Sequence, residues 1–153
     1  MRRILLPIII IVLCSVGNPI WPVTPQTSTT NKIQTAIRAV LDAQRDAWNR
    51  GDIEGYMDGY ERSDQTVFVS GDNVTRGWQT VLDRYKKSYD TREKMGTLTF
   101  SDPEITLLGK DAAVVLGRWH LQRAKDEPHG RFTLVLRRTK QGWKIIHDHT
   151  SSV

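Results

Sequence analysis

The sequence predicts one α+β domain, and three observations lead to that fold class. Apolar residues recur at helical spacing in the first half of the chain and at a period of two after Gly96. Short, turn-rich segments join the later runs, so neighbouring strands should pair antiparallel. A chain of 153 residues has room for one such domain with a real core. We therefore expect three helices packed on one face of a strongly curved, mostly antiparallel sheet.

The first expected helix carries its apolar side chains, from Ile33 to Trp48, on one face. Asn31 is placed to cap its start, and Gly51 suits the left-handed position just past its end. Gln44 is the one polar residue on the apolar face. It is either a boundary residue at the edge of the core or a polar group of a pocket.

Two more helices should follow before the main sheet. Asp52 can cap a short helix with Tyr56 and Tyr60 on one side. A third helix, from Trp78 to about Tyr89, buries one face. Between them, "QTVFVSGDNVTRG" is typical of two short strands joined by a tight turn.

Four strand-like runs complete the domain, at residues 97–108, 112–124, 130–139 and 143–151. Their connections, "GKD", "AKDEPH" and "TKQG", favour a meander of antiparallel neighbours. Pro103 lacks a backbone N–H, so it should lie at a bulge or an unpaired position of the first run.

The N-terminal end is typical of an exported protein. Residues 1–17 combine a basic start, a short apolar run and small residues suited to cleavage, which predicts a signal peptide. Residues 18–31 are rich in proline, threonine and serine and predict a flexible linker, with the folded domain at 32–153. The expected location is periplasmic or secreted. The alternative is an uncleaved N-terminal anchor, which would be the protein's only contact with a membrane.

Composition excludes several classes of function. Cys14 is the only cysteine and lies in the predicted signal peptide, so the mature domain has neither a disulfide nor a thiol nucleophile. Loss of Arg2 and Arg3 lowers the net charge from +5 to +3. Such a mildly basic surface without a block of like charges does not indicate a nucleic acid partner.

Three stretches resemble the nuclear transport factor 2-like superfamily, which includes ketosteroid isomerase and the SnoaL-like polyketide cyclases. They are "AWNRGDIEGYM", "VTRGWQTVLDRY" and "GRFTLVLRRTKQGWKIIHDHTSS". The last is also similar to the end of the calcium/calmodulin-dependent protein kinase II association domain. The resemblance covers about residues 32–152 and implies a cone-shaped fold with a pocket, usually a dimer through the sheet. It implies no single reaction, because this fold carries catalysts, binding modules and assembly hubs.

The last strand contains the sequence His147-Asp148-His149. Strict alternation places the two histidines on the same face as Trp143 and turns Asp148 to the other face. We expect His147 to face the cone and His149 to lie at the pocket mouth or the dimer edge. A zinc ion would need a third ligand, which the isolated His120 and His129 do not supply, so no metal site is expected.

Aromatic side chains are the stronger signal for a pocket. They lie on element faces that should converge, and buried tyrosine and tryptophan need partners for their polar ends. With His147 as a polar group, the predicted ligand-binding residues are Trp48, Tyr56, Tyr60, Phe68, Trp78, Tyr85, Trp119 and His147. Arg118 or Arg138 would hold a carboxylate ligand if either turned inward; the alternative is a solvated strand face.

The resemblance also implies an acidic or imidazole base in an apolar cone. Asp58 and Asp64 are the nearest carboxylates by element, but both are expected to be exposed. His147 is therefore the predicted catalytic residue for proton transfer.

Three functions follow, none of which needs a cofactor. The first is an exported homodimer that binds a small apolar or aromatic molecule in the cone. The second is an isomerase, cyclase or dehydratase that uses the same pocket for acid–base chemistry. The third is a protein-interaction module. Open pocket volume separates the first two from the third, and a buried polar dyad beside that volume favours the enzyme.

Apolar residues on the other sheet face predict a dimer through Val114, Leu116, Val135 and Ile146.

Overall fold

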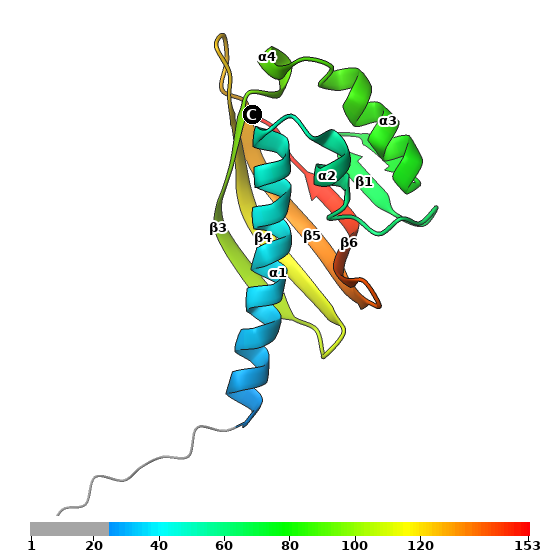
Figure 1. Cartoon of the computed structure of the whole chain (residues 1–153), viewed down its shortest axis with the longest axis vertical. Helices are drawn as coiled ribbons and strands as arrows, with labels where there is room; N and C mark the ends of the chain where they lie inside the picture. Colours follow the sequence, from blue (N-terminus) through cyan, green and yellow to red (C-terminus); the bar gives the residue numbers. More distant parts are fainter. Residues whose placement is uncertain (1–24) are drawn as a thin grey trace, which may run out of the picture.

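The computed structural model describes residues 25–153 and confirms the α+β class (Figure 1). Four helices occur in this range: α1 (Pro25–Asn49), α2 (Ile53–Met57), α3 (Trp78–Ser88) and α4 (Arg92–Met95). The strands of this range are β1 (Val67–Ser70), β2 (Asn73–Arg76), β3 (Thr97–Leu107), β4 (Ala112–Gln122), β5 (His129–Thr139) and β6 (Gly142–Thr150). The short helix α4 was not expected from the sequence.

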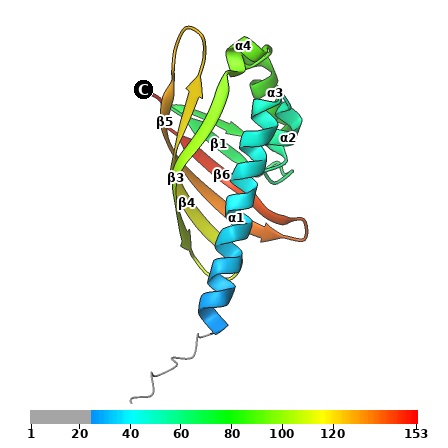
Figure 2. The ribbon, with the colours of Figure 1, turned by 60° about the vertical axis from the view of Figure 1, so that its left-hand side comes forward.

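The six strands form one curved, unclosed sheet in the order β2-β1-β6-β5-β4-β3. All neighbours are antiparallel except β1 and β6, which run parallel. Figure 2 shows the helices on one side of the sheet, with α1 lying along it. The core lies between this helical layer and the inner sheet face, and includes Ile37 of α1, Val81 of α3 and Leu136 of β5, each fully buried.

Helix α1 begins at Pro25, earlier than the sequence predicted. Residues 25–31 are therefore helical rather than a linker, and Asn31 lies inside the helix instead of capping it. A proline is compatible with this start because the first turn of a helix leaves its N–H groups unpaired in any case. The predicted signal peptide and residues 18–24 lie outside the described residues. No helix in the described part is long and apolar enough to cross a membrane.

Two irregularities interrupt the meander. The β3–β4 register shifts between Ser101 and Glu104, around Pro103, as the missing N–H of proline led us to expect. The β5–β6 register shifts between Val135 and Leu136, which pair with His147 and Ile145. Ile146 of β6 therefore has no partner on β5, where Val135 and Leu136 are adjacent. Such an extra residue in one strand of a pair is a β-bulge.

The bulge in β6 overturns the expected alternation of its last residues. Before the bulge Ile145 faces the core, as predicted, with no exposed surface. After it the inward position passes to Asp148, which is 4% exposed, while His147 is half-buried and His149 is exposed. The prediction that His147 faces the cone was wrong because an extra residue reverses the parity of a strand.

Candidate functional site

A cavity of about 70 Å³ lies between the helices and the inner sheet face. Five of the predicted ligand-binding residues line it: Trp48, Tyr56, Tyr60, Tyr85 and Trp119. The other three, Phe68, Trp78 and His147, are not among its lining residues. The space exceeds what one water molecule needs, so the cone has room for a small molecule or a few waters.

Asp148 supplies the carboxyl group of this cavity. Its Oδ2 accepts a hydrogen bond from the Tyr60 hydroxyl at 2.6 Å, and its Oδ1 accepts one from the Thr150 hydroxyl at 2.8 Å. Burial raises the pKa of Asp148 from its ordinary 3.8 to about 6, against the lowering effect of these two hydrogen bonds and of the His149 charge. Asp148 is thus a carboxyl group that exchanges protons close to neutral pH.

Tyr60 reaches Asp148 because its backbone is joined to β6. Tyr60 forms an isolated parallel bridge with Ile145, and the Gly59 carbonyl accepts a hydrogen bond from the Ile145 N–H at 2.9 Å. The Tyr60 side chain is 1% exposed, and burial raises the pKa of its hydroxyl well above the usual value. The hydroxyl therefore keeps its proton at physiological pH and remains a donor.

Tyr56 and Tyr85 extend the polar lining beyond the dyad. Burial raises the pKa of both hydroxyls, and hydrogen bonds with Tyr85 and Tyr60 partly oppose the rise at Tyr56. Gln44 also lines the cavity: it is 1% exposed, and its side-chain amide donates to the Tyr56 carbonyl at 3.1 Å. The sequence left open whether Gln44 is a boundary residue of the core or a polar group of a pocket. Its position in the cavity lining agrees with the second interpretation.

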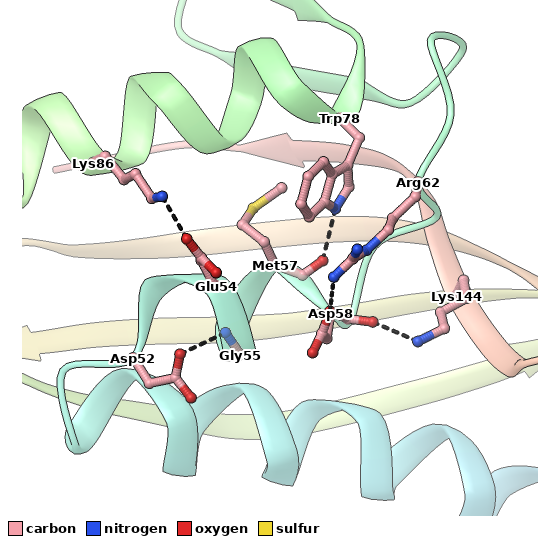
Figure 3. Close-up of polar contacts among 9 residues, drawn as sticks. All are labelled: Asp52, Glu54, Gly55, Met57, Asp58, Arg62, Trp78, Lys86 and Lys144. Atoms are coloured by element: carbon pink, nitrogen blue, oxygen red, sulfur yellow. Dashed lines mark hydrogen bonds and ion pairs between the residues drawn. The ribbon is translucent and has the colours of Figure 1, made fainter.

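Helix α2, which precedes Tyr60, is held at both ends (Figure 3). The Asp52 carboxylate caps its start by accepting from the Gly55 N–H at 2.7 Å. Near its end, the Trp78 indole N–H of α3 donates to the Met57 carbonyl at 2.9 Å, and Lys144 of β6 donates to the Asp58 carbonyl at 2.5 Å. Trp78 thus positions the segment that carries Tyr60 instead of lining the cavity.

The remaining candidates lie elsewhere. Phe68 is buried, and its ring contacts Tyr85 with centroids 5.7 Å apart. Arg118 and Arg138 are exposed, so neither reaches into the cone. Asp58 and Asp64 are exposed, as expected. Among residues 25–153 no three His, Cys, Asp or Glu side chains are grouped to hold a metal ion.

Asp148 is the candidate site residue that the sequence pattern did not reveal. The signal that would have revealed it is the pair Ile145-Ile146, since two adjacent apolar residues in a strand conflict with strict alternation and are compatible with a bulge. The carboxyl can accept or donate one proton, and the Tyr60 hydroxyl donates a hydrogen bond beside it. Such a pair suits proton transfer in an apolar pocket better than metal or nucleophilic chemistry.

The chain belongs to the SnoaL-like domain family, whose model matches residues 37–153. This membership and the fold place it in the nuclear transport factor 2-like superfamily, as the sequence resemblance implied. A comparison with curated proteins gave no match.

Solved structures agree with this assignment. The chain is 42% identical to an NTF-2-like protein of unknown function from Shewanella oneidensis MR-1, with a TM-score of 0.75, over 77% of this chain and 98% of that one. It is 20% identical to a ketosteroid isomerase-like protein from Erwinia carotovora atroseptica, with a TM-score of 0.65, over 80% and 98% of the two chains. An NTF2-like superfamily protein from Salmonella enterica serovar Typhimurium LT2 is 21% identical, with a TM-score of 0.66, over 80% and 92%. The last two similarities establish the fold alone.

Proposed function

We propose that this domain takes a small apolar or aromatic molecule into its cone and moves a proton on it with Asp148. The observation that carries the proposal is the buried Asp148–Tyr60 pair beside open volume. A purely structural polar pair would not need a cavity next to it, and a simple apolar binding site would not need a carboxyl group whose pKa is about 6.

The chemistry follows from the two protonation states of Asp148. Above its pKa the carboxylate accepts a proton from an acidic C–H bond of the substrate, and the same proton then returns to another atom of the substrate. The Tyr60 hydroxyl, hydrogen-bonded to Oδ2, orients the carboxylate. Aromatic walls keep water out and strengthen these electrostatic interactions. Isomerisation, cyclisation and dehydration all use such a step.

The cavity volume restricts the substrate. A volume of about 70 Å³ is roughly half of the ~150 Å³ that holds a benzene ring, so a substrate that carries a ring would have to displace aromatic side chains. Phe132 narrows the cone from the β5 side, and its ring packs directly over Gly117.

Hydrogen exchange tests this proposal even though the natural substrate is unidentified. Small aryl ketones would be incubated with the protein in D₂O, and deuterium entry at the carbon next to the carbonyl followed by NMR. We expect exchange with the natural sequence and none above background with Asp148→Asn, which keeps the shape but cannot accept the proton. Equal exchange with both proteins would exclude Asp148 as the base.

We also propose that the outer sheet face joins two copies of the chain. Val114, Leu116 and Val135 lie half-buried on that face, which no helix of the described part covers. Light scattering at micromolar concentration should give twice the monomer mass, and Leu116→Asp should give the monomer mass. A monomer for the unchanged protein would contradict the dimer.

Export is the remaining part of the proposal, and it rests on the sequence of residues 1–17. N-terminal sequencing of protein from cell fractions should find a start near Asn18 outside the cytoplasm. An intact Met1 in the soluble cytoplasmic fraction would contradict export.

A further inference from the structure

Two tryptophans line the cavity, and they are held in different ways. Trp48 is 2% exposed, its indole N–H donates to the Met95 carbonyl at 3.1 Å, and three tyrosine rings meet it edge-on. Trp119 is half-exposed, and its indole N–H donates to the Ser151 carbonyl at 2.9 Å. No aromatic ring of residues 25–153 stacks on the Trp119 indole or meets it edge-on. Trp119 is therefore the lining tryptophan that is free to move once one hydrogen bond near the surface breaks.

The mouth of the cavity is formed by Phe100, Trp119 and Thr150, because these lining residues are half-exposed and all the others are buried. Phe100 is held by Phe132, whose ring it meets edge-on with centroids 5.4 Å apart. Thr150 is held by the hydrogen bond from its hydroxyl to Asp148. Trp119 is the one mouth residue that neither a ring contact nor a hydrogen bond joins to another side chain within the described chain.

Gly130 of β5 makes room for the Trp119 indole. Trp119 and Gly130 are partners in the pairing of β4 with β5. A Cβ at Gly130 would clash with the Ser151 oxygen and would lie 3.0 Å from Nε1 of Trp119, so the indole and the carbonyl meet over the glycine. The indole thus lies across β5 at the mouth. A rotation of the Trp119 side chain would move the indole away without breaking the backbone pairing of β4.

The cavity is too small for a ring while the indole is in this position. Its volume is about 70 Å³, whereas a benzene ring needs a cavity of ~150 Å³. An indole is larger than a benzene ring, so its movement out of the mouth would free the room that a ring needs. The movement costs little, because the indole N–H exchanges the Ser151 carbonyl for water.

We propose that Trp119 is the gate of the cone and decides whether a substrate that carries a ring can enter; this rests on the proposed function. A compound without a ring fits behind the closed indole. An aromatic substrate displaces the indole, places its ring beside Phe100 and directs its polar group toward Asp148. Since the closed position must be given up first, the apparent affinity for such a substrate is reduced by the fraction of molecules that are open.

Acetone and acetophenone test the gate, because both are methyl ketones and only acetophenone carries a ring. Their affinities for the full chain would be measured by titration in ¹H–¹⁵N spectra, with the indole N–H signals of Trp48 and Trp119 as reporters. We expect acetophenone to open the Trp119 N–H to hydrogen exchange with solvent and to leave the Trp48 N–H protected. Acetone should leave both N–H groups protected.

Two variants weaken the closed position by different means. Gly130→Ala displaces the Ser151 carbonyl, and Trp119→Phe removes the indole N–H. Each should tighten the binding of acetophenone about fivefold, the equilibrium factor of one net hydrogen bond, and leave the binding of acetone unchanged. Gly71→Ala, in the turn between β1 and β2, is the matched control. Its added Cβ would meet no atom within 4 Å, so it should change neither affinity.

The outcomes separate the gate from the proposed proton transfer. The gate is refuted if the Trp119 N–H stays protected in the acetophenone complex, or if both variants leave the affinity for acetophenone unchanged. It is also refuted if both variants raise the two affinities alike, since the mouth is then only loosened. If acetophenone opens the gate but takes up no deuterium, the gate stands and proton transfer by Asp148 fails. If neither ketone shifts the signals of Trp48 and Trp119, binding in the cone and the gate both fail.

Discussion

The two faces of the sheet show how one strand can serve two environments. On the inner face β6 presents Ile145 and then Asp148 to the aromatic cone. On the outer face it presents His147 and His149, which pair in register with Val135 and Thr133 of β5. His120 and His129, directly opposite each other on β4 and β5, also lie on the outer face, so all four histidines of the chain are outside the cone.

The difference between the faces lies in solvation. An exposed ionisable group keeps its hydration, and its charge costs the fold little. The Asp148 carboxyl has lost nearly all of its hydration and has two hydroxyl donors instead, and this loss is the source of its raised pKa. Because the bulge adds one residue to β6, Asp148 occupies the buried inward position, and His147 and His149 lie on the outer face.

Asp148→Asn should have the largest effect: it should raise the stability of the fold at high pH and abolish proton transfer. The folded pKa of about 6 exceeds the ordinary 3.8, so between these pH values the folded state binds more protons than the unfolded state, and stability falls as pH rises. The full cost, about 3 kcal/mol, is present above pH 6. The variant should therefore be more stable at pH 8 and gain nothing below about pH 4, while losing proton transfer. Urea unfolding at a series of pH values measures this.

The matching change on the outer face is His147→Gln. Both variants replace one polar residue of β6, but only the inner one should abolish the deuterium exchange of small ketones. A loss of exchange in His147→Gln would contradict the contrast between the faces.

Gly117→Ala should have the next largest effect, because it changes the shape of the cone. A Cβ at this position would lie 2.3 Å from Cζ of Phe132, so the ring must move toward the cavity. We expect a loss of about 1–3 kcal/mol of stability, typical of overpacking, and weaker binding of small ligands. Thermal unfolding and ligand titration measure the two effects. Gly71→Ala is an instructive comparison, since its added Cβ would meet no atom within 4 Å and only the backbone would be strained.

His149→Ala should have the smallest effect within the cone. The charge of His149 lowers the pKa of Asp148, and it is the weakest of the causes that act on this carboxyl. Its removal should raise the pKa of Asp148 slightly and leave the shape of the cavity unchanged. A ¹³C titration of the carboxyl carbon detects this shift. A fall in the pKa would contradict the direction of the interaction.

Much of the architecture could be predicted from the sequence because it depends on periodicity. The apolar face of α1 and the antiparallel meander follow from spacing and residue type, as do five of the aromatic residues that line the cavity. Three features did not follow. The start of α1 at Pro25 extends into a polar segment that composition alone assigns to a linker. The bulge at Ile146 depends on pairing with β5, and the pKa of Asp148 depends on burial by distant residues such as Tyr60. Both are tertiary effects.

The titration of Asp148 tests the central claim most directly. Its carboxyl carbon would be followed by NMR in the natural sequence and in Tyr60→Phe. The predicted midpoint for Asp148 is about 6, and Tyr60→Phe should raise it further because the lost hydrogen bond favoured the ionised form. A midpoint near the ordinary 3.8, unchanged by Tyr60→Phe, would mean that Asp148 is solvated and would contradict the proposed site.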